Sequence, residues 1–471
     1  MTQSASKWLR RFRGKRDGDE EEQYERADIA SIYHRAARQD LTTRNPVIVI
    51  PGVMGSNLVA TESSKSIWGD FRDRDDAQGM RLIGLPMKLG TPLDQLQSLS
   101  ASDGTLGELK SRVAGMTVRL SFYGDVLSAL GVGSYVGKAR VRSQHIPDYH
   151  AGDSTSVAFE FSYDWRRSLD ESAAALQQFI TQATRFLQLQ RGNSNPIKFD
   201  IVAHSMGGLV LRYFLQYGGQ RIPYDGSLPR LNWAGANAVE TAVIVGTPNG
   251  GSLKVLDRLV SGLPKTPLTP AYGPIITGTM PSLYQLMPRT RHKPLIARGE
   301  SESPDLFDPD LWLSMQWGLA DKSRETELAI LLPGISSASE RRDTAIEHLH
   351  KCLKNAKAFH AAMDIRVSFR PSHLRMHLFA GDGILTPVLC TASRGDRRLE
   401  FLSYAPGDGT VLRSSALLDE RVGSEWAPRL DSPLQWDSVM FLPSSHMGLT
   451  RDPVFINNVL YLLLEKPRSS H

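Results

Sequence analysis

Cysteine is scarce in this sequence, because only Cys352 and Cys390 occur among its 471 residues. Two cysteines exclude a disulfide-dense secreted scaffold and are compatible with a reducing compartment. No apolar run approaches the ~20 residues that a membrane-spanning helix requires. The N-terminus carries positive charge but lacks the apolar segment that follows it in a signal peptide. These absences predict a cytoplasmic protein that is soluble or bound peripherally to a membrane.

A strong excess of charge of either sign is also missing. The formal net charge is +5, and much of it lies in Lys7–Arg16, so the remaining chain is close to neutral. This balance gives no electrostatic basis for nucleic-acid binding. The segment GTPNGGS lacks the lysine of a P-loop, and GVGSYVG does not fit the dinucleotide fingerprint. We therefore expect no nucleic-acid partner and no cofactor.

The first 43 residues differ from the rest of the chain. A basic stretch with Trp8, Leu9 and Phe12 is followed by the acidic segment Asp17–Arg26. We interpret residues 1–43 as a disordered, solvated tail. The alternative is a weak membrane-surface anchor, because aromatic and basic residues together favour anionic lipid interfaces.

Strand and helix patterns alternate from residue 44 onward. Apolar runs such as Val47–Ile50 and Phe199–Ala203 predict buried strands, and helical patterns separate them. This alternation indicates βαβ units and an α/β fold with a mainly parallel sheet. Pro-rich loops and aromatics interrupt the pattern after Gly251, and we expect the sheet to resume at Met376–Gly383 and Leu399–Val411. The predicted parts are a tail (1–43), a first core part (44–251), a cap or lid insertion (252–365) and a second core part (366–471).

The segment AHSMG, residues 203–207, resembles a nucleophile elbow, Gly-x-Ser-x-Gly, with Ala203 in place of the first glycine. A predicted strand precedes Ser205, and a helical pattern follows it. Ser205 is therefore the candidate nucleophile. A helix N-cap is the alternative role for this serine, but it does not explain the two glycines, Gly207 and Gly208.

A serine nucleophile needs a base and an acid that orients the base, in the chain order Ser, acid, His. His446 follows the last strand pattern and is the candidate base, since His471 lies at the chain end. Two aspartates in Gly-Asp-Gly turns, Asp382 and Asp408, are candidates for the acid. Spacing alone does not separate them.

Acyl transfer also needs N–H donors for the oxyanion. Met206, directly after the candidate nucleophile, would supply one backbone N–H. The turn after the first strand, Pro51–Ser56, would supply the other from Val53. An ordinary β-to-α turn is the alternative interpretation of that segment.

A metal site is the alternative for His348, His350 and Cys352. His348 and Cys352 could share a helix face, but His350 points elsewhere. We interpret these residues as ordinary surface and core positions of a helix, and we expect no metal.

Seven motifs occur in the order in which they occur in a known family: VIVIPGVMGSNL, WGD, FSYDWRRS, AHSMGGLV, VGTPNGGS, GDGTV and SSHMGL. Together they resemble the lecithin:cholesterol acyltransferase-like α/β-hydrolases, a group that includes lysosomal phospholipase A2 and phospholipid:diacylglycerol acyltransferase. The resemblance covers residues 47–450. It implies an α/β-hydrolase fold with a cap and a mobile lid. It also implies Asp408, in GDGTV, as the acid, and the backbone N–H groups of Val53 and Met206 as the oxyanion hole.

These observations predict a serine-dependent lipid esterase or O-acyltransferase of phospholipase A or acyltransferase type. Its partner would be a lipid ester substrate, with peripheral membrane contact. Animal members of the family are secreted and have disulfides, and this chain has neither a signal peptide nor enough cysteines, so a lipoprotein-type substrate is not expected. The alternatives are a non-catalytic lipid- or partner-binding protein on a hydrolase fold and an esterase for soluble esters or lactones.

Overall fold

The computed structural model describes residues 32–33, 35, 44–71, 76–106, 108–113, 116–121, 136–140, 157–266, 269–298, 302–367, 369–423 and 427–466. The predicted tail, residues 1–43, lies outside the described residues except at three positions. One of these, Tyr33, is buried, and its hydroxyl donates a hydrogen bond to the backbone oxygen of Asn457 (2.7 Å). This contact ties one point of the segment to the C-terminal helix.

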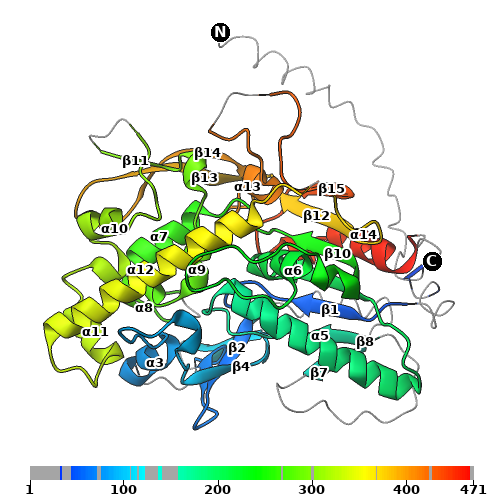
Figure 1. The fold of residues 1–471 in the computed structure, drawn as a ribbon, viewed down its shortest axis with the longest axis horizontal. Coiled ribbons are helices and arrows are strands. Elements are labelled where there is room, and N and C mark those ends of the chain that lie inside the picture. The colour runs from blue at the N-terminus through cyan, green and yellow to red at the C-terminus, as the bar shows by residue number, and fades with distance from the viewer. Residues whose placement is uncertain are drawn as a thin grey trace.

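A seven-stranded parallel sheet forms the centre of the fold (Figure 1). Its strands are β1 (Val47–Ile50), β7 (Val136–Arg140), β8 (Val157–Glu160), β9 (Phe199–His204), β10 (Val239–Val245), β12 (Arg375–Gly381) and β15 (Ser438–Leu442). The spatial order is β15-β12-β10-β9-β1-β8-β7, and each neighbouring pair runs parallel. The predicted α/β fold with a mainly parallel sheet is confirmed.

Alternating side chains of the central strands supply two hydrophobic cores. Ile48 and Ile50 of β1 pack in the core that includes the buried residues of α5 (Leu169–Arg191) and α6 (Met206–Tyr217). Val47 and Val49 belong to the second core, which includes α14 (Pro453–Leu464). Strands covered on both faces need apolar residues at every position, and this explains the continuous apolar runs in the sequence.

Helices dominate the chain between β10 and β12. They are α7 (Leu253–Ser261), α8 (Pro274–Gly278), α9 (Pro281–Gln285), α10 (Pro309–Met315), α11 (Glu325–Leu331) and α12 (Ala338–Met363). The short strand β11 (Leu295–Ala297) lies among them in sequence. This helical insertion between two strands of the parallel sheet lies where we expect the cap. The cap boundaries at residues 252 and 365 remain a prediction.

The expectation that residues 399–411 rejoin the central sheet is wrong. β14 (Glu400–Gly407) pairs antiparallel with β13 (Ile384–Ala392), and β11 completes a separate three-stranded sheet. The burial of β14 alternates along the strand. Such alternation suits a sheet with one solvated face and does not suit a central parallel strand.

The remaining strands and α-helices are short. They are β2 (Ser56–Ala60), β3 (Ser66–Trp68), α3 (Asp76–Ile83), β4 (Ser100–Thr105), β5 (Glu108–Val113), β6 (Met116–Ser121) and α13 (Arg413–Leu417). Within the described residues, no helix combines the length and the apolarity that crossing a bilayer requires.

Candidate active site

Ser205 lies at the sharp turn between β9 and α6. Its backbone has φ 54° and ψ −126°, and its N–H donates to the carbonyl oxygen of Val245 on β10 (2.7 Å). A positive φ at a residue other than glycine costs on the order of 1–3 kcal/mol and persists only where the surroundings hold it. The side chain makes no capping hydrogen bond to α6. The hydroxyl is therefore not used as a helix N-cap, which was the alternative role for this serine.

The two glycines after the serine are required by close packing. A Cβ on Gly207 would lie 2.5 Å from the carbonyl oxygen of Pro51, at the end of β1. A Cβ on Gly208 would lie 2.0 Å from Oγ1 of Thr247, after β10. That threonine hydroxyl also donates to the carbonyl oxygen of Ser205 (2.9 Å). The turn after β9 is thus packed closely between the ends of β1 and β10, the two strands that flank β9 in the sheet.

Three of the predicted site residues form one hydrogen-bonded chain. Nε2 of His446 lies 2.9 Å from Oγ of Ser205, and Nδ1 of His446 lies 2.7 Å from Oδ2 of Asp408. A neutral imidazole that donates Nδ1–H to the carboxylate leaves Nε2 free to accept the serine proton. Asp408 is 2% exposed and Ser205 is 6% exposed.

The turn around Asp408 fixes its carboxylate. Oδ1 accepts hydrogen bonds from the backbone N–H groups of Thr410 (2.9 Å) and Val411 (2.7 Å), so Oδ2 is left for the imidazole. The backbone N–H of His446 also donates to the carbonyl oxygen of Asp408 (2.9 Å). Two hydrogen bonds therefore join these two residues.

The other aspartate that the sequence offered is placed differently. Asp382 is half-buried in the turn after β12, and its backbone N–H donates to the carbonyl oxygen of Leu442 (3.2 Å). Of the two aspartates, Asp408 is the one hydrogen-bonded to His446.

Two glycines that sequence reasoning did not single out line the His446–Asp408 pair. Gly246 has φ +57°, and a Cβ there would lie 3.4 Å from Nδ1 of His446 and 3.5 Å from Oδ2 of Asp408. A Cβ on Gly381, the last residue of β12, would lie 2.4 Å from Cβ of Asp408. Gly246 directly follows β10 and Gly381 is the last residue of β12, so a glycine at a strand end was the available signal.

A second histidine, His204, contacts the backbone of His446, and the sequence did not predict this contact. It is buried, and its Nε2 lies 3.1 Å from the carbonyl oxygen of His446. Burial, and then the positive charge that His446 can carry, lowers the pKa of His204 from 6.5 to about 3. The ring is therefore neutral near pH 7, and Nε2–H donates to that carbonyl. Its position directly before the serine was the only signal in the sequence.

The predicted oxyanion donors lie on two segments that touch each other. Met206 is the first residue of α6, and Val53 lies in the turn after β1. The packing of Gly207 on the carbonyl oxygen of Pro51 brings the turn and the helix start together.

Two long side chains hold the turn after β1. The hydroxyl of Tyr163 donates to the carbonyl oxygen of Pro51 (2.8 Å), and Nε1 of Trp68 donates to that of Met54 (2.8 Å). These bonds give a structural reason for the WGD and FSYDWRRS motifs.

The histidines of α12 are placed as ordinary helix positions. His348 and Cys352 are buried, and Nε2 of His348 lies 3.0 Å from the carbonyl oxygen of Thr279. His350 is exposed. Among the described residues, no three or more His, Cys, Asp or Glu side chains form a group that could hold a metal ion.

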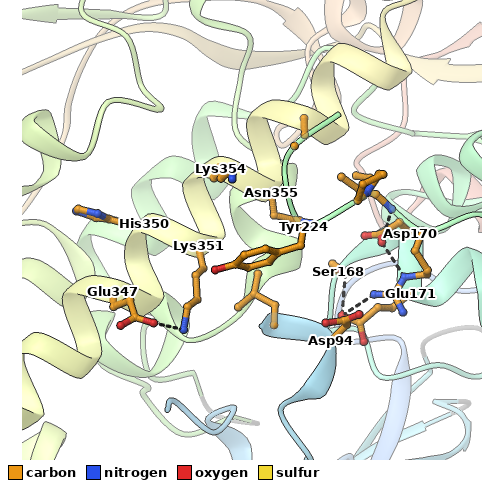
Figure 2. Close-up of a pocket in the computed structure, with 16 residues that line it drawn as sticks. Asp94, Ser168, Asp170, Glu171, Tyr224, Glu347, His350, Lys351, Lys354 and Asn355 are labelled. Atoms are coloured by element: carbon orange, nitrogen blue, oxygen red, sulfur yellow. Dashed lines mark hydrogen bonds and ion pairs between the residues drawn. The ribbon is translucent and has the colours of Figure 1, made fainter. Parts of the chain in front are cut away.

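A cavity of about 290 Å³ lies between the start of α5, the segment Arg221–Gly226 and α12 (Figure 2). Ser205, His446 and Asp408 do not line it. Its charged walls are largely paired, since Arg221 contacts Asp170 (2.8 Å) and Lys351 contacts Glu347. This cavity is separate from the Ser205–His446–Asp408 arrangement.

Part of the chain is similar in sequence to known proteins. Residues 152–307 match the family described as lecithin:cholesterol acyltransferase. Proteins named lysosomal phospholipase A and acyltransferase, from Bos taurus and Rattus norvegicus, are each 27% identical over 229 residues. Those segments cover 47% and 46% of this chain, and 51% and 50% of the two relatives, so the chain spans about half the length of the curated relatives it matches.

A solved structure matches over most of the chain. It is a chain of the crystallised Tle4–Tli4 complex, with a TM-score of 0.53 and 16% sequence identity over 90% of this chain and 98% of that chain. At this identity the likeness shows the fold alone, and the fold is that of the α/β-hydrolases.

Proposed function

We propose that this distant relative of the lecithin:cholesterol acyltransferase family is a serine-dependent lipid esterase or O-acyltransferase. Its substrate would be a lipid ester, and its reaction would pass through an acyl-enzyme. The observation that carries the proposal is the continuous hydrogen-bonded chain from Ser205 through His446 to Asp408. The remote family relationship supports the lipid nature of the ester.

Acylation begins with proton transfer from Oγ of Ser205 to Nε2 of His446. The oxygen attacks the acyl carbonyl carbon, and the carbonyl oxygen becomes an oxyanion. Backbone N–H groups of Val53 and Met206 would donate hydrogen bonds to that oxyanion. When the tetrahedral intermediate collapses, the ester C–O bond breaks, and His446 returns its proton to the leaving alcohol.

Deacylation uses the same groups in reverse. His446 takes a proton from an incoming water or lipid alcohol, whose oxygen attacks the acyl-enzyme. Collapse of the second intermediate breaks the bond to Ser205 and returns the proton to its oxygen. Water as acceptor gives a fatty acid, and a lipid alcohol gives a new ester. Throughout, Asp408 keeps the imidazole oriented and stabilises its transient positive charge.

Labelling with a fluorophosphonate probe tests the proposal. We expect wild type to label and Ser205→Ala not to label. Asp408→Asn should slow labelling by roughly 10³–10⁴-fold, because the triad members act as a unit. Asp382→Asn is the matched control and should label at close to the wild-type rate.

The outcomes separate the alternatives. A folded wild type that does not label with or without lipid or detergent supports the non-catalytic binding protein. A labelled enzyme that turns over short soluble esters or lactones and leaves phospholipid untouched supports the soluble-ester hydrolase. Equal effects of Asp382→Asn and Asp408→Asn would contradict the assigned roles. For an active enzyme, adding a lipid alcohol and measuring the new ester separates transfer from hydrolysis.

A further inference from the structure

We propose that the outer face of the β11–β13–β14 sheet docks on the surface of a phospholipid bilayer that contains anionic lipid. This inference rests on the proposed function, because it specifies that the enzyme would encounter its lipid ester in a bilayer. It concerns residues outside the Ser205–His446–Asp408 arrangement.

The outer face carries large apolar side chains where a solvated sheet face normally carries polar ones. β14 alternates so that Leu402 (48% exposed) and Tyr404 (51%) are exposed, and the Tyr404 ring also contacts the Phe401 ring (centroids 6.5 Å apart). Leu385 on β13 is 72% exposed and lies opposite Pro406 in the antiparallel register. Ile296 on β11, 39% exposed, extends the same face. We call Ile296, Leu385, Leu402 and Tyr404 the hairpin face.

The inner face of this sheet is already occupied. Cys390 on β13 is buried, and the ammonium group of Lys254 on α7 lies 5.1 Å from the centre of the Phe401 ring. Among the described residues, the inner side is packed against α7, whereas the outer side carries exposed Leu385, Leu402 and Tyr404 beside the Arg298–Glu400 ion pair. A concentration of exposed apolar side chains on one face is typical of a surface that binds a partner or a membrane.

Strand β13, which carries Leu385, also contacts the turn that holds Asp408. Ile384, next to Leu385, forms a β-bridge with Asp408. The hydroxyl of Thr386 accepts a hydrogen bond from the backbone N–H of Gly409 (2.9 Å). Leu385 of the hairpin face therefore lies between two residues of β13 that contact the turn of the proposed acid.

The turn at the other end of the hairpin is basic. Between β13 and β14 the chain carries three exposed arginines, Arg394, Arg397 and Arg398, against one aspartate, Asp396, and Arg397 also pairs with Asp321 (3.5 Å). Basic side chains beside exposed apolar ones favour an interface with anionic lipid over neutral lipid. The positive charge of this turn therefore favours an anionic bilayer surface over a purely apolar protein partner as the occupant of the hairpin face.

Co-sedimentation with vesicles tests the docking surface. Vesicles of phosphatidylcholine alone and of phosphatidylcholine mixed with phosphatidylglycerol would be compared. The test variant is Leu385→Ser/Leu402→Ser. The control is Leu189→Ser/Leu228→Ser, which removes two leucines of similar exposure (83% and 44%) elsewhere on the surface. A second variant, Arg394→Gln/Arg398→Gln, examines the charge. Every sample is also labelled with the soluble fluorophosphonate probe.

We expect wild type and the control to bind mixed vesicles, and the leucine variant to bind at least about tenfold more weakly, since two large apolar side chains no longer enter the interface. The arginine variant should lose affinity mainly for the anionic vesicles. Unchanged binding of the leucine variant, an equal loss in the control, or no vesicle binding by wild type would overturn the docking surface. Self-association that the leucine variant abolishes, without vesicle binding, would assign the face to a second copy and also overturn it. In each case, labelling of Ser205 reports separately on the proposed function.

Discussion

Replacing Gly381 with alanine tests whether the position of Asp408 controls the reactivity of Ser205. The new Cβ would lie 2.4 Å from Cβ of Asp408 and 3.1 Å from both its Cα and the carbonyl oxygen of Ser444. Ordinary van der Waals contact begins at 3.4 Å, so the two Cβ atoms must separate by at least about 1 Å. Two of these three contacts are to backbone atoms, so a side-chain rotation cannot relieve the overlap.

If the carboxylate of Asp408 moves by that distance away from His446, the hydrogen bond on which the orientation of His446 depends breaks. Oδ2 of Asp408 is now 2.7 Å from Nδ1 of His446, and 1 Å more takes the pair beyond hydrogen-bond distance. A misplacement of about 1 Å can cost about 10²-fold in rate, which corresponds to about 2.7 kcal/mol of transition-state stabilisation.

The assay is the rate of fluorophosphonate labelling, with thermal unfolding as the check on folding. Gly334→Ala is the matched control, because a Cβ there meets nothing within 4 Å. We expect the control to label at the wild-type rate and Gly381→Ala to label about 10²-fold more slowly while still folded. A folded Gly381→Ala protein that labels at the wild-type rate would refute the reasoning.

Two further predictions concern stability. Arg166 is fully buried and donates to Asp164, to the carbonyl oxygens of Leu82 and Ile83 and to two serine hydroxyls. Arg166→Met should destabilise the fold by about 3–5 kcal/mol in denaturant unfolding, whereas Arg298→Met, in an exposed ion pair, should cost no more than about 1 kcal/mol. Burial lowers the pKa of His348 from 6.5 to about 4, so the unfolded chain takes up this proton first as the pH falls. As the pH falls from 6.5 to 4, His348 should therefore lower the free energy of unfolding by about 1.4 kcal/mol per pH unit. His348→Gln should remove this contribution from the pH dependence of the unfolding free energy. An unchanged pH profile in the variant would contradict this assignment.

Local sequence patterns were sufficient for several central strands, among them β1 and β9, and for the serine turn. The run Val47–Ile50 is apolar at every position because both faces of β1 are covered, and such a run can be recognised without knowing its neighbours. The strand, the serine and the two glycines of the elbow are likewise contiguous. The strained backbone of Ser205 and the close packing of Gly207 follow from that contiguous pattern.

Patterns that look alike locally could not be separated in this way. Asp382 and Asp408 both lie in Gly-Asp-Gly turns after strands, and the motif resemblance favoured Asp408. In the structure, the β13–β14 hairpin leads away from the end of β12 and returns, so that Asp408 lies against Gly381 and beside His446. The supporting roles of His204 and Gly246 were missed for the same reason, because each contacts a residue about 200 or more positions away.

The sequence by itself determined the parallel α/β core, the turn that carries Ser205, and the family resemblance, since all three are recorded in short contiguous segments. Only the tertiary structure decided which aspartate meets His446, which glycines make room for that pair, and which face of the β11–β13–β14 sheet stays open. Those features depend on contacts between segments that are distant in sequence. The alternation along β14 does not say which face of the sheet is covered by protein. The packing of α7 against Phe401 decides this.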